Sequence, residues 1–114
     1  MTYRARRARH KYGAIKTKVG ERTYDSRAEA RYAQHLAHLK DIGVVVGWIP
    51  QIPFLLPGGI RYKADFLIFY SDGETKLVDV KGVSTPVFEI KKKLMAECYP
   101  WMPLVIVPAK EVPR

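Results

Sequence analysis

The clearest periodic segment of the chain has helical spacing and follows Ser26. The Ser26 side chain can cap a helix, and Glu29 three positions later completes a capping box. The spacing predicts a helix from Ser26 to about Asp41, because Gly43 then provides a stop. On its inward stripe we expect Glu29, followed by Tyr32, Ala33, Leu36 and either Leu39 or Lys40.

Beyond this helix the pattern changes to extended runs. Residues 44–48 and 52–56 have the composition of strands, but Pro50 and Pro53 interrupt them, which predicts an edge strand or a bent one. Residues 61–70 and 74–81 predict two strong strands, and residues 71–73 join them.

A second helix is expected after these strands. Thr85 can cap it, Pro86 suits its first position, and it should end near Tyr99. Its apolar stripe is expected to contain Val87, Ile90, Leu94 and Cys98. Residues 104–107 then predict a final strand of the fully buried kind.

The order of these elements predicts an α/β fold with an αβββαβ core, in which helices flank one mixed sheet. Residues 15–19 and 22–24 flank a Gly-Glu pair and predict a small hairpin that closes one end of the domain. We therefore divide the chain into a basic arm with a short hairpin, residues 1–24, and one main domain, residues 25–114. A length of 114 residues leaves no room for a second core.

The charge of the chain points to a polyanionic partner. Lys and Arg number 20 against 11 Asp and Glu, which gives a net charge of +9. Residues 1–24 hold eight of these cations and only Glu21 as an anion, so this arm alone carries +7. The candidate DNA contacts are Arg4, Arg6, Arg7, Arg9, Lys11 and Lys16 in the arm, with Lys91 and Lys92 on the second helix.

Membrane and secreted classes fit the sequence poorly. The longest apolar run, residues 42–49, is far shorter than the roughly 20 residues that a membrane helix needs. The arm has Arg and Ala but few bulky apolar residues, so it should insert little into a membrane surface. A lone Cys98 and the absence of a signal-type apolar stretch behind the basic start indicate a reducing cytoplasm.

Candidate chemistry lies on the two strong strands. In a strand of period two, Asp79 and Lys81 point to the same face. A three-residue loop with Gly73 in the left-handed position places Asp65 opposite Asp79, whereas a two-residue turn places Asp65 on the other face. We prefer the three-residue loop, because it gathers the charges and leaves Phe66, Ile68, Val78 and Val80 together on an apolar face.

Two carboxylates opposite each other in a sheet repel, and a divalent cation removes this difficulty. Two aspartates, a backbone carbonyl and waters suit Mg²⁺, which also accepts phosphate oxygens. Lys81 could then assist an attacking water or neutralise charge that develops on the phosphate. We expect Glu29 to reach this site only if the first helix lies across the same face of the sheet.

These residues resemble the PD-(D/E)xK nuclease superfamily. Glu29, Asp65 and the run Asp79-Val80-Lys81 follow its order, with Ala64 where the motif often has proline and Asp79 as the D/E. The αβββαβ order also resembles the core of that superfamily. A narrower similarity, over about residues 11–107, is to small phage-encoded nucleases related to Holliday junction resolvases. It rests on Lys11-Tyr12-Gly13, residues 24–30, Gln51, Ala64-Asp65-Phe66, residues 79–82 and residues 91–94.

The resemblance implies Mg²⁺-dependent hydrolysis of DNA phosphodiesters, in which Mn²⁺ can substitute for Mg²⁺. Asp65 and Asp79 would be metal ligands, Glu29 an additional ligand, directly or through water, and Lys81 the water-orienting residue. It gives Gln51 no catalytic position.

Resolution of a four-way junction would also require a homodimer, since two symmetric cuts need two sites. The candidate interface is residues 44–56, with Trp48, Ile49, Phe54 and Leu55. The alternatives are a nucleic-acid-binding module without catalysis and a nuclease that acts on unbranched DNA.

Overall fold

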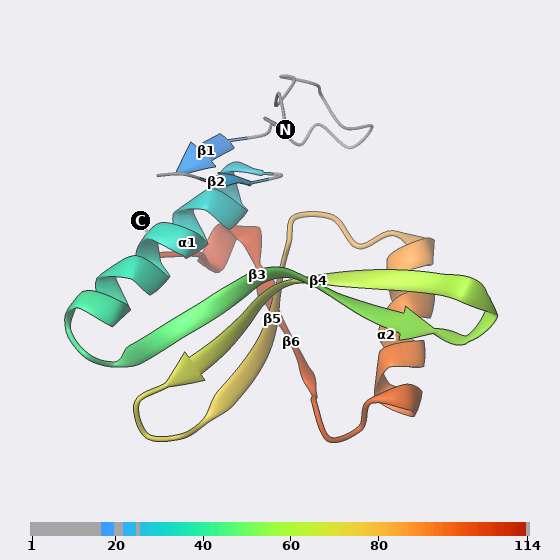
Figure 1. Ribbon diagram of the computed structural model, residues 1–114. Helices are drawn as coiled ribbons and strands as arrows, with labels where there is room; N and C mark the ends of the chain where they lie inside the picture. Colours follow the sequence, from blue (N-terminus) through green and yellow to red (C-terminus); the bar gives the residue numbers. More distant parts are fainter. Residues whose placement is uncertain (1–16, 20–21, 25, 114) are drawn as a thin grey trace, which may run out of the picture.

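The computed structural model describes residues 17–19, 22–24 and 26–113, and it confirms the expected order of elements. Helix α1 is followed by three strands, helix α2 and a last strand (Figure 1). The bounds are β1 (Thr17–Val19), β2 (Arg22–Tyr24), α1 (Arg27–Asp41), β3 (Val45–Leu56), β4 (Ile60–Tyr70), β5 (Thr75–Lys81), α2 (Pro86–Cys98) and β6 (Leu104–Pro108).

The main sheet has the order β3-β4-β5-β6 and is mixed, as predicted. The β3–β4 and β4–β5 pairs are antiparallel, whereas β5 and β6 are parallel because α2 forms the crossover between them. Strands β1 and β2 form a separate antiparallel hairpin beside α1 (Figure 1), which confirms the predicted hairpin within the described residues.

Helix α1 forms as predicted. The Ser26 hydroxyl accepts a hydrogen bond from the Glu29 amide at 3.1 Å, and Gly43 follows the helix with φ of +84°. The inward stripe is buried as expected, at Glu29, Tyr32, Ala33 and Leu36. Leu39, rather than Lys40, continues it and packs against the core.

Helix α2 also has its predicted ends, but its apolar stripe was predicted correctly only in part: Leu94 and Cys98 pack against the core, whereas Val87 and Ile90 do not. The Thr85 hydroxyl accepts from the Phe88 amide at 3.1 Å, and the helix ends before Tyr99. Phe88 and Met95 are the buried residues, while Val87 and Ile90 are 60% and 57% exposed. The helix places its large aromatic ring against Tyr62 of the sheet, which turns Val87 and Ile90 outward.

Strand β6 is not the fully buried strand that its apolar sequence predicted. It lies at the edge of the sheet, next to β5 alone, and Val105 is 42% exposed. Strand β3 occupies the other edge, as its two prolines predicted, and it is a single strand that bends rather than two.

The core has two parts on opposite faces of the sheet, and the long β3–β4 hairpin contributes to both. The part that includes α1 contains Phe66, Ile68, Val78 and Val80, as the three-residue loop predicted. The part that includes α2 contains Tyr62, Ala64, Leu67 and Leu77. In a regular strand all even-numbered residues share one face. Strand β4 therefore changes face between Ala64 and Phe66, and the hairpin passes from α1 to α2 (Figure 1).

Candidate functional site

Asp65 and Asp79 lie where β4 and β5 separate. The register between these strands confirms the three-residue loop: the Tyr70 amide donates to the Glu74 carbonyl, and Gly73 has φ of +92°. The last paired residues of β4 and β5 are Phe66 and Val78, so Asp65 and Asp79 are opposite each other one position beyond the paired stretch. There the Asp65 carboxylate accepts a hydrogen bond from the Val80 amide at 2.8 Å, in place of a backbone carbonyl of β4.

The two carboxylates interact strongly. Asp79 is 1% exposed and Asp65 is partly buried. Burial raises the pKa of Asp65 far above its ordinary value, and the negative charges of Asp79 and Glu29 raise it further. The hydrogen bond from Val80 acts in the opposite direction without cancelling the rise. Without a cation, the acidic pair therefore retains a proton well above the usual range of a carboxyl.

Lys81 is the cation beside this pair. Its Nζ lies 3.4 Å from Oδ2 of Asp79, which confirms that the two side chains share a face of β5. The same Nζ lies 4.1 Å from the centroid of the Phe88 ring, a distance at which an aromatic face attracts a cation. Helix α2 therefore helps to fix Lys81 through Phe88.

Glu29 joins the site from the first turn of α1. Its carboxylate is buried, 3% exposed, and Oε1 accepts from Nε2 of Gln51 at 2.5 Å. Its hydrogen-bond donor Gln51 lies opposite Asp65 in the β3–β4 pair, and the charge of Glu29 contributes to the raised pKa of Asp65. Our condition that α1 must lie across the carboxylate face was wrong. Helix α1 covers the opposite face, and Glu29 reaches the site where β3 and β4 change face.

The four predicted site residues lie within the part of the chain that matches a known family. Residues 9–110 match the family described as "Protein of unknown function (DUF1064)". The chain belongs to the DUF1064 family. A comparison with curated proteins gave no match. The DUF1064 region spans the whole αβββαβ core, so Glu29, Asp65, Asp79 and Lys81 are all part of the family domain.

The donors of this DUF1064 site suit a hard divalent cation better than a structural metal. Residues 26–113 contain no cluster of three or more His, Cys, Asp or Glu side chains that could hold a metal ion by itself. They do contain two neighbouring aspartates, and the buried Oδ2 of Asp79 has Lys81 as an ion-pair partner at 3.4 Å but no regular hydrogen bond among the described residues. Mg²⁺ typically uses one or two carboxylates and fills its other positions with water and phosphate. The acidic pair fits that pattern.

Three residues of the site were missing from our prediction: Gln51, Tyr62 and Phe88. Tyr62 is 4% exposed, and its buried hydroxyl lies beside the Asp79 carboxylate. Burial raises its pKa, and the charge of Asp79 raises it further. Period two places Tyr62 on the face opposite Asp65, so only the change of face in β4 brings it here. Phe88 could have been found from the seven-residue spacing that it shares with Met95.

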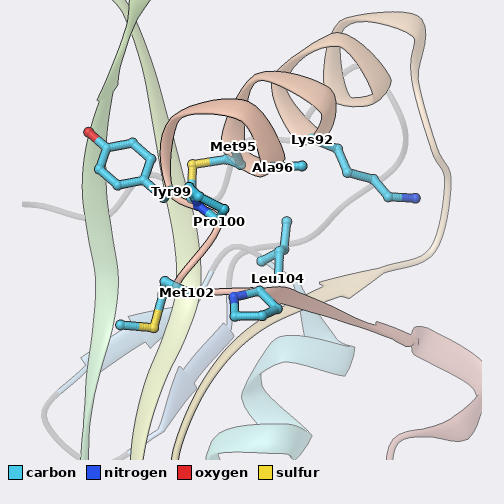
Figure 2. A pocket seen from close by; sticks show the side chains of 8 residues that line it. Lys92, Met95, Ala96, Tyr99, Pro100, Met102 and Leu104 are labelled. Atoms are coloured by element: carbon cyan, nitrogen blue, oxygen red, sulfur yellow. The ribbon is translucent and has the colours of Figure 1, made fainter.

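The predicted DNA-contact residues are only partly located. The six arm residues from Arg4 to Lys16 lie outside the described residues. Lys91 is half-buried, whereas Lys92 is exposed and lies 3.9 Å from the Glu89 carboxylate. Lys92 also borders an apolar cavity of about 310 Å³ between α2 and β6, lined by Met95, Tyr99 and Leu104 among others (Figure 2). No helix in the described part of the chain is long and apolar enough to cross a membrane.

Proposed function

We propose that this DUF1064 chain is a Mg²⁺-dependent endonuclease that hydrolyses DNA phosphodiesters. The proposal rests on one observation: where β4 and β5 separate, Asp65 and Asp79 lie next to each other, and Lys81 lies 3.4 Å from Asp79. A buried pair of carboxylates is costly to a fold that gains nothing from it. The order of Glu29, Asp65, Asp79 and Lys81 along an αβββαβ core, which resembles PD-(D/E)xK nucleases, also supports it.

The chain supplies defined parts of this chemistry. Asp65 and Asp79 would hold the metal directly, and Glu29 through water. When bound, Mg²⁺ supplies Lewis acidity at a phosphate oxygen. The Lys81 ammonium orients the attacking water and offsets the negative charge that develops on the phosphate. Water adds to phosphorus and loses a proton to solvent, the bond from phosphorus to one sugar oxygen breaks, and that oxygen takes up a proton from solvent.

The direct test is incubation of the protein with supercoiled, linear and four-way-junction DNA, with Mg²⁺ or with chelator. We expect cleavage with Mg²⁺ and none with chelator. Binding without cleavage under every condition would replace the proposal with its alternative, a nucleic-acid-binding module. If linear duplex is cleaved as fast as the four-way junction, the protein is a nuclease without a preference for branched DNA.

For the substrate we propose branched DNA, cut by a homodimer, in the cytoplasm of a bacterial host of the phage type that the resemblance implies. The candidate interface, residues 44–56, needs a correction. Trp48 and Phe54 pack against the two parts of the protein's own core, so they are not free for a partner. Ile49 and Leu55 remain 46% and 65% exposed, and Val46 is 63% exposed. Light scattering in solution tests this proposal through the mass of the particle.

Replacing Lys81 with methionine should reduce the cleavage rate at saturating Mg²⁺ by about 100-fold, because one stabilising charge is lost from the transition state. The Mg²⁺ concentration for half-maximal rate should change much less, since lysine is not a ligand. Lys76→Met on the same strand is the matched control, because Lys76 is exposed and lies 3.9 Å from Glu74 at the far end of β5. Equal rates for both variants would remove Lys81 from the mechanism.

Deleting residues 1–10 should weaken binding to any DNA and flatten its dependence on salt. The deleted segment carries Arg4, Arg6, Arg7 and Arg9. For duplex DNA, each lost phosphate contact should lower the slope of log K against log salt by about 0.9. The measurement is fluorescence anisotropy between low and physiological salt, and an unchanged slope would show that the arm does not contact DNA.

A further inference from the structure

Gln51 has an unusual backbone in the middle of β3. It is the one residue other than glycine with a positive φ, +52°, in the part of the chain that the structure describes. Non-glycine residues seldom adopt this region, because the Cβ atom approaches the carbonyl oxygen. Such strain persists only where the surrounding structure enforces it, and it concentrates at functional sites.

The position of Gln51 in the sheet connects this strain to the carboxylates. Pro50 pairs with Phe66 and Ile52 pairs with Ala64, so Gln51 lies opposite Asp65 across the hairpin. Strand β4 changes face at the same place, between Ala64 and Phe66. The left-handed residue therefore coincides with the bend that brings Asp65 to the site.

The side chain of Gln51 completes the connection. Its Nε2 donates to Oε1 of Glu29 at 2.5 Å, across from the edge strand to the first turn of α1. Glu29 is 3% exposed, and its charge acts on Asp65. A regular extended residue at position 51 would direct its side chain elsewhere, because successive extended residues alternate between faces.

We infer that Gln51 is a positioning residue, which fixes the Glu29 carboxylate toward the acidic pair through a strained left-handed backbone. The inference rests on the proposed function, because Glu29 is positioned for Mg²⁺. Gln51 itself contacts Glu29, and it acts on metal binding through that carboxylate.

Two substitutions separate the side chain from the backbone. Asparagine tolerates a left-handed φ better than most residues but is one methylene too short to reach Glu29. Glycine removes both the amide and the strain. We expect Gln51→Asn and Gln51→Gly each to raise the Mg²⁺ concentration for half-maximal cleavage about tenfold, as loss of a partner that orients a ligand commonly does. Mg²⁺ affinity from calorimetry of the DNA-free protein should fall by the same factor.

A purely structural role gives different results. A structural role would lower the melting temperature of Gln51→Asn and leave its Mg²⁺ affinity unchanged. Under our inference Mg²⁺ affinity falls in both variants, and Gln51→Gly melts within a few degrees of the wild type or above it. Gln34→Asn on the exposed face of α1 is the matched control and should alter neither property. Wild-type Mg²⁺ affinity in both Gln51 variants would overturn the inference while the nuclease proposal stands. A wild-type protein that neither binds Mg²⁺ nor cleaves DNA would overturn both.

Discussion

Replacing Asp79 with asparagine should lower Mg²⁺-dependent DNA cleavage by roughly 10²–10³-fold, with DNA binding intact or tighter. Asp79 is 1% exposed, and its buried Oδ2 lies 3.4 Å from Nζ of Lys81. An amide nearly preserves the shape of the carboxylate but is a poor ligand for a hard cation. Less negative charge would also face the phosphates, which explains the unchanged or tighter binding.

Asp72→Asn is the control for this experiment. Asp72 is exposed in the loop of the same hairpin, and asparagine retains the oxygen that accepts from the Glu74 amide. Cleavage rate and DNA affinity should be measured for both variants, the latter in Ca²⁺ to prevent turnover. Full cleavage by Asp79→Asn would contradict the proposed site, and equal loss in Asp72→Asn would show that the effect is not local.

The arrangement of strands and the pairing of the aspartates could be predicted because they depend on local features. Gly73 in a three-residue loop fixes the register of β4 and β5, and period two then determines the neighbours of Asp79. The capping residues Ser26 and Thr85 fixed the starts of both helices in the same way.

The change of face in β4 could not be predicted, because the hydrophobic pattern shows no irregularity at Asp65 or at Gln51, which lies opposite it. Nothing in the hydrophobic pattern indicates that Gln51 adopts a left-handed conformation. Without that bend, period two leaves Tyr62 on the wrong face and requires α1 to cover the carboxylates. The first half of the α2 stripe was predicted wrongly because Val87 and Phe88 fit a helical period equally well until the sheet beneath them is known, whereas Leu94 and Cys98 pack against the core as predicted.

Asp65→Asn should stabilise the metal-free protein, and increasingly so as the pH rises. The pKa of Asp65 is raised by burial and by its acidic neighbours, so the folded state binds more protons than the unfolded state above the ordinary value near 4. The free energy of unfolding of the wild type therefore falls as the pH rises through that window. Between pH 4 and pH 7, about three pH units, Asp65 can therefore lower the free energy of unfolding by at most about 4 kcal/mol.

Asparagine avoids this cost, because it has no proton to lose and still offers an oxygen to the Val80 amide. The two proteins should melt alike at about pH 4, and the variant should melt several degrees higher at pH 8 in chelator. Mg²⁺ should raise the melting temperature of the wild type and leave the variant nearly unchanged, because only the wild type presents both carboxylates. A variant less stable than the wild type at pH 8, or a difference independent of pH, would contradict a strained acidic pair. A stabilised variant that cannot cleave DNA would show that this pair is retained for activity at the expense of stability.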